Sequence, residues 1–410
     1  MENPKIRFKG FTKDWEQRKL SDVLDIVTKR NGEKYGKEEV LSVSDEYGCI
    51  NQIKFQGRSF AGEDISNYKI VDTGDIIYTR SPLKSKPYGI IKVVGDEIGI
   101  VSPLYIVNKV KEGNNSQFIY RVFDSPEKTN KYLSPLVRKG AKNTMNISND
   151  EWLSGKIDVA PSYEEQYQIG LYFDHLDNLI TLHQRKCEQT KNLKKYMLQK
   201  MFPQNGAKVP EIRFNGFTHD WEQRKLGEDL VSIHTGTNLL GSITNTGMPL
   251  IKMGNIQRGY FDTSKVEFLA ENEQPDKADI VNYGDFFFNT RNTLELVGKG
   301  ATWMKNSGEY AFNSNIARFE LRNLDTIFFN YLYNTDYMTK QIHARAMGTT
   351  SVAAIYPRTL DSVEYLAPCM KEQQKIGAYF KQLDHLITLH QRQCDELKKM
   401  KKYMLQNMFI

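Results

Sequence analysis

The stretch "IRFKGFTKDWEQRKL" at residues 6–20 returns as "IRFNGFTHDWEQRKL" at residues 212–226. Thirteen of the fifteen positions are identical, and the two copies lie 206 residues apart. The whole chain has 410 residues, so each copy stands near the start of one half. A segment repeated this closely indicates that both halves are built on one plan.

A second repeated segment ends each half. Residues 165–202 read "EQYQIGLYFDHLDNLITLHQRKCEQTKNLKKYMLQKMF" and residues 372–409 read "EQQKIGAYFKQLDHLITLHQRQCDELKKMKKYMLQNMF", with 25 of 38 positions identical. The middles between opening and ending, residues 21–163 and 227–370, have 143 and 144 residues and differ widely in sequence. Each half is therefore a shared opening, a long middle of its own and a shared ending.

Short similar segments indicate that the two middles share a fold. "VDTGDIIYTR" at residues 71–80 parallels "VNYGDFFFNTR" at residues 281–291, and each predicts a Gly-Asp turn, a buried strand and a polar loop. The spacing from Gly140 to Pro161 nearly equals that from Gly348 to Pro368. Strand-like runs such as "GIIKVVG" and helical runs such as "IFFNYLYNTDYMTKQI" alternate, so we expect two globular domains of mixed α/β type.

The shared endings are predicted to be long helices. Apolar or semi-apolar residues recur at alternating spacings of four and three, which is the pattern of a coiled-coil seam. The first copy of this seam comprises Ile169, Phe173, Leu176, Ile180, His183, Cys187, Met197 and Met201, and the second comprises Ile376, Phe380, Leu383, Ile387, His390, Cys394, Leu397, Met404 and Met408. Further apolar side chains widen this surface, at Leu179, Leu182, Tyr196 and Leu198 and at Leu386, Leu389, Tyr403 and Leu405. The surplus predicts contact with globular domains or with another protein.

These observations predict an α+β fold with two globular domains, an antiparallel pair of long helices and an internal pseudo-twofold repeat. We expect the first domain at residues 1–160 (with its repeated opening at 4–20) and the first helix at 161–203, then the second domain at 204–367 (opening at 210–226) and the second helix at 368–410. The linker at residues 203–209 reaches at most about 25 Å. Pseudosymmetry then predicts that the second helix ends within a similar distance of the first opening.

Composition excludes few function classes. The net charge of +6 is a mild basic excess, compatible with a polyanionic partner. No run of 18 apolar residues and no apolar signal core occur, so we expect a cytoplasmic protein without a membrane span. The four cysteines form no CxxC pair, which predicts free thiols.

The sequence contains no persuasive catalytic signature. There is no P-loop, no GxSxG elbow, no HExxH and no glycine-rich dinucleotide fingerprint. "PDKAD" at residues 275–279 resembles part of a nuclease carboxylate set, but an exposed loop is the better interpretation. His183 and His390 occupy matching seam positions, where polar residues fix helix register more often than they bind metal. We therefore predict no catalytic residue and no metal site.

Polar and basic residues gather instead in two parallel loops of each middle. Arg, Lys, Asn and Thr on loops are the side chains that hold phosphates and read base edges. The candidates for DNA binding are Arg80, Lys84, Lys86, Tyr88, Arg138, Lys139, Lys142 and Asn143 in the first half, and Arg291, Asn292, Lys299, Arg345, Thr349, Thr350, Ser351 and Arg358 in the second.

The chain resembles the specificity subunit of type I restriction-modification systems. The resemblance rests on "GFTKDWEQRKL" and "GFTHDWEQRKL", on "GDIIYTR" and "GDFFFNTR", on the P-x-x-x-E-Q entries at Pro161 and Pro368, and on the paired "LITLHQR" helices. It covers essentially the whole chain. It implies two target-recognition domains that each bind half of a split sequence in double-stranded DNA, and a coiled coil that sets the spacer between the halves.

The same resemblance implies partners. Two modification subunits would dock on the repeated scaffold and two restriction subunits would join them. S-adenosylmethionine, ATP and Mg²⁺ are expected in those partners and no cofactor in this chain. The repeated "DWEQRKL" supplies the docking candidates Trp15, Arg18, Trp221 and Arg224.

Three other readings stay open from the residues alone. A stand-alone bipartite DNA-binding regulator would bind its site tightly without partners. A coiled-coil adapter would show no salt-dependent affinity for DNA. A self-contained nuclease is the weakest, because no set of carboxylates supports it.

Overall fold

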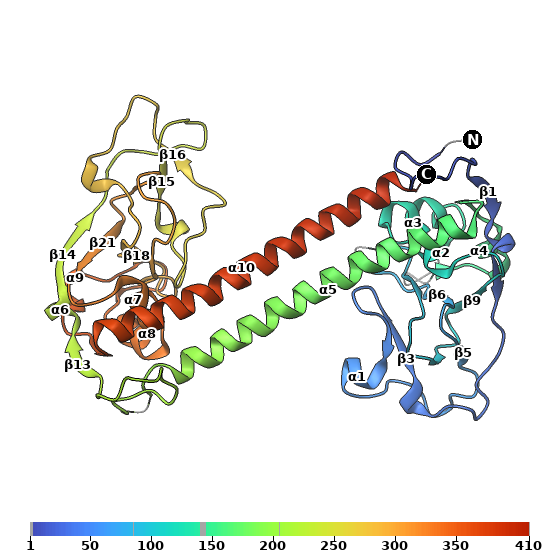
Figure 1. Cartoon of the computed structure of the whole chain (residues 1–410), viewed down its shortest axis with the longest axis horizontal. Coiled ribbons are helices and arrows are strands. Elements are labelled where there is room, and N and C mark those ends of the chain that lie inside the picture. The colour runs from blue at the N-terminus through green and yellow to red at the C-terminus, as the bar shows by residue number, and fades with distance from the viewer. Residues whose placement is uncertain (1–2, 85, 140–144, 205, 410) are drawn as a thin grey trace. The chain divides into compact units, whose positions relative to one another are not determined.

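The computed structural model describes residues 3–84, 86–139, 145–204 and 206–409 (Figure 1). The chain divides into two compact units. Unit 1 comprises residues 1–184 with 391–410, and unit 2 comprises residues 185–390. Each long helix contributes one part to each unit. Within the described residues no helix is both long and apolar enough to span a membrane.

A four-stranded antiparallel sheet forms the centre of unit 1. Its strand order is β2 (Leu24–Ile26), β9 (Ile106–Val110), β6 (Ile76–Tyr78) and β7 (Ile91–Val93). Strand β6 is wholly buried, as predicted from "GDIIYTR". The Gly-Asp turn before it is confirmed, since Gly74 has φ 89° and Asp75 Oδ2 accepts the Asp72 N–H at 2.9 Å. Burial raises the pKa of Asp75 to about 6.

Unit 2 repeats this sheet with the same topology. The order is β14 (Leu230–Thr235), β21 (Ile316–Leu321), β17 (Phe286–Asn289) and β19 (Gly300–Thr302). The turn before β17 has the same geometry, because Gly284 has φ 89° and Asp285 Oδ2 accepts the Asn282 N–H at 2.9 Å. The two middles therefore share a fold despite their different sequences, as the similar segments at residues 71–80 and 281–291 predicted.

Smaller sheets surround each central sheet. In unit 1 they pair β1 (Glu16–Lys19) with β12 (Lys156–Val159), β3 (Leu41–Ser44) with β4 (Gly48–Asn51), β5 (Lys69–Val71) with β8 (Gly99–Val101), and β10 (Arg138–Lys139) with β11 (Met145–Asn146). In unit 2 they are β13 (Glu222–Lys225) with β24 (Glu364–Ala367), then β16 (Glu267–Phe268), β15 (Pro249–Ile251) and β20 (Ala311–Phe312), and finally β18 (Arg291–Asn292), β23 (Ala353–Ala354) and β22 (Met347–Gly348).

Short helices complete both units. Unit 1 has α1 (Gln52–Gln56), α2 (Ser116–Val122), α3 (Pro126–Leu133) and α4 (Asn149–Ser154), with 3₁₀ turns η1 (Leu20–Asp22) and η2 (Lys37–Glu39). Unit 2 has α6 (Leu226–Asp229), α7 (Thr326–Tyr333), α8 (Asp336–His343) and α9 (Pro357–Leu360), with η4 (Met253–Asn255) and η5 (Lys277–Asp279). Equivalent caps start α2 and α7, since Asn115 accepts the Phe118 N–H at 3.0 Å and Asp325 accepts the Phe328 N–H at 2.8 Å.

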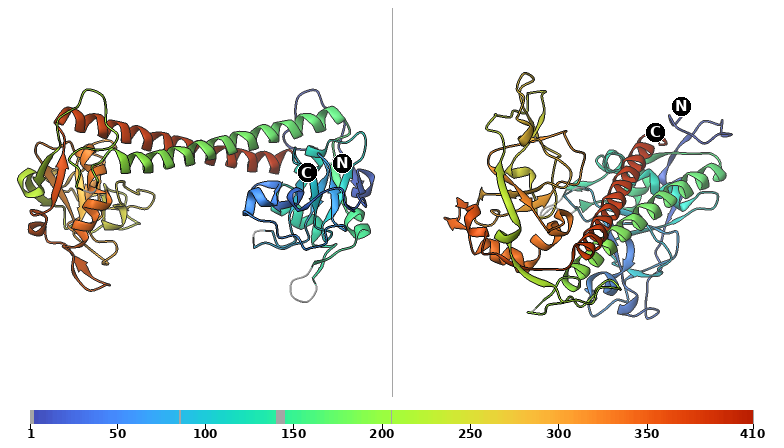
Figure 2. Two further views of the ribbon diagram at one scale, coloured as in Figure 1. Left: turned by 90° about the horizontal axis from the view of Figure 1, so that it is seen from below. Right: turned by 60° about the vertical axis from the view of Figure 1, so that its left-hand side comes forward.

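The two repeated endings are the helices α5 (Tyr163–Lys200) and α10 (Met370–Asn407), each of 38 residues. Within each unit they lie side by side and antiparallel (Figures 1 and 2). The predicted seam is confirmed, because its members from Ile169 to Cys187 and from Ile376 to Cys394 are largely buried, with the two histidines half-buried.

Equivalent ion pairs join the helices in both units. Lys401 Nζ lies 2.8 Å from Asp177 in unit 1, and Lys194 Nζ lies 2.5 Å from Asp384 in unit 2. Both residues of one pair stand 207 positions from their counterparts. The repeat therefore preserves a specific side-chain contact as well as the apolar seam.

A buried arginine–carboxylate pair fastens each opening to the start of a long helix. Arg7 makes a two-pronged contact with Glu165, with Nε–Oε1 at 2.5 Å and Nη2–Oε2 at 2.8 Å. Arg213 makes the same contact with Glu372, at 2.7 Å for both prongs. Both carboxylates are 0% exposed. This geometry explains why the repeats keep "IRF" and "EQ" so closely.

The glutamine after each glutamate ties the helix to its globular domain. Gln166 donates to Ala160 O at 2.8 Å and accepts the Asn115 N–H at 2.8 Å. Gln373 donates to Pro368 O at 2.9 Å and accepts the Asp325 N–H at 2.9 Å. Both glutamines therefore fix the segment before the helix and the cap of α2 or α7.

The end of α10 lies at the first opening, as pseudosymmetry predicted. The Ile6 N–H donates to Asn407 O at 3.0 Å, and the Ile212 N–H donates to Lys200 O at 2.9 Å. The same backbone contact thus joins opening and helix end whether or not a linker connects them. We expect a circular permutant that starts at the second opening to fold.

The Arg7–Glu165 pair predicts a large effect of removing either arginine. Arg7→Met leaves a buried carboxylate without its partner and should lower the free energy of unfolding by about 3–5 kcal/mol. Arg213→Met should match it in unit 2. Urea unfolding followed by tryptophan fluorescence measures both.

The control is Arg18→Met, which removes an exposed pair with Glu16 and should change stability by less than about 1 kcal/mol. Arg7→Met combined with Glu165→Gln should recover part of the loss. Equal losses for Arg7→Met and Arg18→Met would contradict the anchoring role.

Candidate nucleic-acid interface

In each unit the structure brings the two predicted polar loops together. In unit 2, β18 pairs with β23, so that Arg291 stands opposite Ala354, and the Ile355 N–H donates to Thr290 O at 2.9 Å. In unit 1 the Arg80 guanidinium reaches Ile147 O, just beyond β11, at 3.4 Å. Loops that are far apart in the sequence therefore form one surface at equivalent places in both units.

The unit 2 surface is a short hairpin beside an arginine-bearing strand. Strands β22 and β23 are joined by a tight turn that leaves Thr349, Thr350 and Ser351 exposed, and Arg291 on β18 is exposed beside it. The hairpin extends from the side of unit 2 away from α10 (Figure 2). Gly348 has φ 131°, and a Cβ there would meet Val352 O at 2.3 Å, so the turn requires glycine.

Hydroxyls on a short hairpin and an arginine on the strand beside it are groups that can contact a groove of duplex DNA. Thr349 Oγ1 and Ser351 Oγ lie 3.2 Å apart, which fixes the turn. Arg358 is exposed on α9, the helix that follows the hairpin. Asn292 is less available for an external contact, because its Oδ1 already accepts the Thr293 N–H at 2.8 Å.

Arg345 is held by the protein itself. Its guanidinium bonds Thr359 O at 2.8 Å, Gln341 O at 2.7 Å and Ser362 O at 2.9 Å. These bonds brace the segment behind the hairpin, and the predicted DNA contact of Arg345 stays a prediction. Lys299 is also engaged, with its Nζ 2.7 Å from Gln257 Oε1, and burial lowers its pKa.

The unit 1 candidates divide in the same way. Arg80 has φ 55° and donates through Nε to Leu104 O at 2.7 Å, so it holds two loops together. Lys86 is paired with Asp45 at 2.5 Å and its side chain is 11% exposed. Tyr88 is half-buried against the core. Both cations are bound internally in this structure, and their direct contact with DNA stays a prediction.

The remaining unit 1 candidates lie on the surface or outside the described residues. Lys84 is exposed, and Arg138 is 83% exposed in its side chain while lying 3.0 Å from Glu151. The backbone of Lys139 belongs to β10. Lys142 and Asn143 lie outside the described residues, so their predicted role stays a prediction.

The docking candidates also separate by burial. Trp15 and Trp221 are each 2% exposed and pack in the cores of units 1 and 2, so neither indole is offered at the surface and their docking role stays a prediction. Trp15 Nε1 instead donates to Glu165 Oε1 at 3.3 Å. Arg18 and Arg224 are partly exposed and pair with Glu16 and Glu222. They stay candidates.

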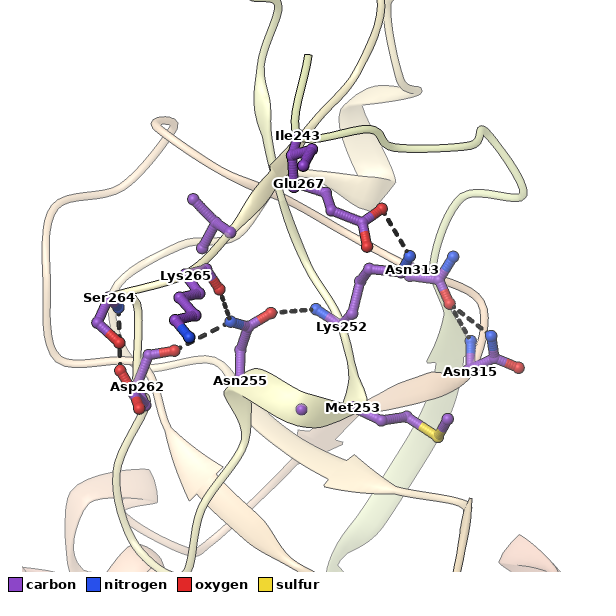
Figure 3. A pocket seen from close by; sticks show the side chains of 12 residues that line it. Ile243, Lys252, Met253, Asn255, Asp262, Ser264, Lys265, Glu267, Asn313 and Asn315 are labelled. Atoms are coloured by element: carbon purple, nitrogen blue, oxygen red, sulfur yellow. Dashed lines mark hydrogen bonds and ion pairs between the residues drawn. The ribbon is translucent and has the colours of Figure 1, made fainter. Parts of the chain in front are cut away.

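A polar cavity beside the unit 2 surface was missed by the sequence analysis (Figure 3). Its volume is about 620 Å³, and Lys252, Lys265, Asn313 and Asn315 are among its lining residues. Asn315 O accepts the Thr290 hydroxyl at 3.1 Å, so the cavity wall adjoins the strand that leads to Arg291. Lys252 Nζ lies 2.8 Å from Glu267. The signal in the sequence was only "NSN" at residues 313–315, which reads as an ordinary turn.

No group of three or more metal-ligating side chains occurs among the residues that the structure describes. None of the four cysteines, all of which lie in the described residues, forms a disulfide, and two are buried in the helix seam. What the unit 2 surface offers is hydrogen-bond donors on a turn that is held by its own hydrogen bonds.

A family model described as the type I restriction modification DNA specificity domain matches residues 12–192 and, again, residues 218–399. The chain belongs to this family. The two matches fall on the two halves that the repeat defines, and together they cover most of the chain.

Relatives agree with this assignment. The putative type I restriction enzyme MjaX specificity subunit of Methanocaldococcus jannaschii is 23% identical over 414 residues, covering 95% of this chain and 91% of that protein. The type I restriction enzyme MjaVIII specificity subunit of the same organism is 25% identical, covering 59% and 58%. The crystal structure of the type I restriction-modification S subunit from M. genitalium has a TM-score of 0.61 at 12% identity and covers 100% of this chain and 99% of that one, which shows a shared fold.

For a DNA-recognition protein, the geometry predicts opposite effects of substituting two arginines of unit 2, Arg291 and Arg345. Arg291→Met removes an exposed cation, so affinity for a mixed-sequence duplex should fall and the slope of log K against log salt should shrink by about 1. Its melting temperature should not change. Fluorescence anisotropy across a salt series measures the slope.

Arg345→Met should behave in the reverse way. It should lower the melting temperature, because several backbone carbonyls lose their hydrogen-bond donor. The slope of log K against log salt should stay the same. If Arg345→Met alone reduced the slope, Arg345 would be the phosphate contact and the brace assignment would fall.

Proposed function

We propose that this specificity protein reads a bipartite site in double-stranded DNA, with one block contacted by each unit. The observation that carries the proposal is the matched placement of two unlike polar surfaces on two copies of one scaffold. In unit 2 the contacts are Arg291, Thr349, Ser351 and Arg358, which are exposed on or beside the β22–β23 hairpin. In unit 1 the equivalent hairpin β10–β11 carries Arg138.

The polar cavity of unit 2 extends this proposed surface. Lys265 brings a cation, and Asn313 and Asn315 bring amides, to a wall that adjoins Thr290. Lys252 is paired there with Glu267 at 2.8 Å, and DNA phosphate would compete with that carboxylate for it. Cations and amides are the groups that bind phosphate and base edges. Unit 2 thus presents more donors than its hairpin alone.

The long helices are proposed to set the spacer between the blocks. A helix of 38 residues is about 57 Å long. A buried seam and the Lys401–Asp177 and Lys194–Asp384 ion pairs resist sliding of one helix along the other. The number of unread base pairs would therefore follow from the helices and not from the loops.

The helices also expose a repeated apolar stripe. In unit 1 its exposed members include Leu179, Leu182 and Tyr403, and in unit 2 they include Leu389, Leu193 and Tyr196. Leu182 and Leu389 are equivalent, as are Tyr196 and Tyr403. Exposed apolar side chains of this kind mark protein-binding sites.

We propose that this stripe, with Arg18 and Arg224 as rim candidates, binds one modification subunit per unit. Two identical docking surfaces fit two copies of one partner. Two restriction subunits would complete the assembly. S-adenosylmethionine, ATP and Mg²⁺ are proposed to bind those partners and not this chain.

Duplicating one middle tests the reading role. Replacing residues 21–163 with a second copy of residues 227–370 should yield a target in which the unit 2 block occurs twice, inverted because the helices are antiparallel. The copied Tyr331 would face Asp177 as it now faces Asp384, where its hydroxyl lies 2.9 Å from the carboxylate. The spacer should not change, since both helices stay.

Mapping methylated adenines in cells that express this chain with its modification subunit gives the target. Wild-type chain in the same cells is the control. A duplicated variant that still methylates two unlike blocks, or one that changes the spacer, would contradict the division of labour between loops and helices.

Charge in the stripe tests the docking role. Leu182→Glu with Tyr403→Glu in unit 1 should reduce the complex from two modification subunits per chain to one, because a buried carboxylate in the contact is strongly unfavourable. Leu389→Glu with Tyr196→Glu should do the same through unit 2. Native mass spectrometry of co-expressed complexes counts the subunits.

Lys191→Glu, an exposed change nine residues from Leu182 and so on the opposite face of α5, is the control and should keep two subunits. A complex that retains both partners after all four stripe substitutions would place the docking surface elsewhere.

A further inference from the structure

A continuous chain of charged and polar side chains runs through unit 1 from the loop after β6 to both long helices. Lys86 Nζ lies 2.5 Å from Asp45 Oδ1, and Lys92 Nζ lies 3.5 Å from the same oxygen. Lys92 also bonds the Tyr120 hydroxyl at 3.2 Å, and that hydroxyl donates to Asp124 Oδ1 at 2.9 Å. Five side chains thus connect a loop of the proposed DNA surface to the end of α2.

From Asp124 the chain reaches the helices. Asp124 Oδ2 lies 2.7 Å from Arg121 and 2.7 Å from Lys401 of α10. Arg121 contacts Asp174 at 2.7 Å and Asp177 at 2.6 Å, both on α5. All these residues belong to unit 1.

The network is buried where it crosses the domain. Lys92 is 8% exposed and Arg121 is 2% exposed. Four cations, Lys86, Lys92, Arg121 and Lys401, face four carboxylates, Asp45, Asp124, Asp174 and Asp177, so formal charge balances. Buried charges interact strongly with each other, and removing one exposes the rest to a desolvation penalty.

Unit 2 has no such chain at the equivalent positions. The strand register aligns Lys92 of β7 with Ala301 of β19, and the helix caps align Tyr120, Arg121 and Asp124 with Asn330, Tyr331 and Asn334. Asn330 instead bonds the Thr302 N–H at 2.9 Å and Gly259 O at 3.1 Å, and Asn334 bonds Gly300 O at 3.1 Å. These two asparagine contacts are neutral and stay next to the sheet, whereas the Tyr331 hydroxyl donates to Asp384 of α10 at 2.9 Å.

We propose that Asp45, Lys86 and Lys92 are positioning residues that couple the loop after β6, which adjoins the β10–β11 side of the proposed unit 1 surface through Arg80, to the helix pair. Through them, charges at Asp177 and Lys401 hold Lys86 and its neighbours in place, so reading of the unit 1 block depends on the helices. Reading of the unit 2 block does not depend on them in this way. The coupling rests on the proposed function. It would make the two units unequal in how far their reading depends on the helices, which the repeated scaffold alone would not produce.

The matched pair Lys401→Met and Lys194→Met tests the proposal in the full chain. Each variant breaks the equivalent helix-to-helix ion pair, but only Lys401 also contacts Asp124. Lys401→Met should speed hydrogen exchange of the amides at residues 86–90 by about fivefold, near the low end of couplings within one ion-pair network. Lys194→Met should leave them unchanged.

Asp45→Asn perturbs the network at its other end. The Asp45 side chain is 34% exposed, so this substitution is not expected to cause misfolding. It should speed exchange at residues 86–90 to a similar degree. With the modification subunit present, Lys401→Met and Asp45→Asn should relax the bases methylated in the unit 1 block and keep the unit 2 block.

The outcomes separate cleanly. Unchanged exchange at residues 86–90 in both Lys401→Met and Asp45→Asn would overturn the coupling. So would equal relaxation of both blocks by Lys401→Met, since that would be a general effect of the helices. If no bipartite methylation pattern exists in the wild type, the proposed function fails, while the exchange measurement still decides the coupling.

Discussion

A carboxylate buried at the start of each long helix is the constraint on which both units depend. Glu165 and Glu372 are inaccessible to solvent, and each is neutralised by an arginine from an opening more than 150 residues away. A buried charge is tolerated only with a well-aligned partner, so the opening must return to the helix. That return brings Trp15 or Trp221 into the core and lets the opening pair with the last turn of the other helix. The repeated sequence is the signature of this closure.

The same scaffold then accepts two different interiors. In unit 1 the helix α2 meets α5 through Arg121 and its aspartates, whereas in unit 2 the helix α7 meets α10 through the Tyr331 hydroxyl and Asp384. One interior relies on compensated charge and the other on aromatic packing with single hydrogen bonds. Both keep the lysine–aspartate pair between the helices. The fixed contacts are thus those between opening and helices, and the variable ones lie between helix and reading domain.

Sequence patterns predicted the parts of the fold that follow from periodicity and turn chemistry. The seam positions, the Gly-Asp turns and the buried strands β6 and β17 were all predicted, because each has a local signature. The contacts of the candidate site residues were not predicted, since residue type does not show which partner a side chain meets. Arg80, Lys86 and Arg345 are basic loop residues in the sequence, yet all three bind internal carbonyls or carboxylates. Arg291, Thr349 and Ser351 have equally plain sequence signals and lie exposed.

This division has a physical reason. A loop that extends from a domain must be held by polar contacts at its base, because it has little apolar surface to bury. Arginine and lysine serve there as well as at the tip, and the base contacts are long-range in sequence, as Arg345 to Ser362 and Arg80 to Leu104 show. Basic residues near the glycine or proline of such a loop are therefore divided between bracing and recognition. The bracing residues must match the scaffold, while the exposed ones are free to differ, and this freedom lets one duplicated fold carry two unlike reading surfaces.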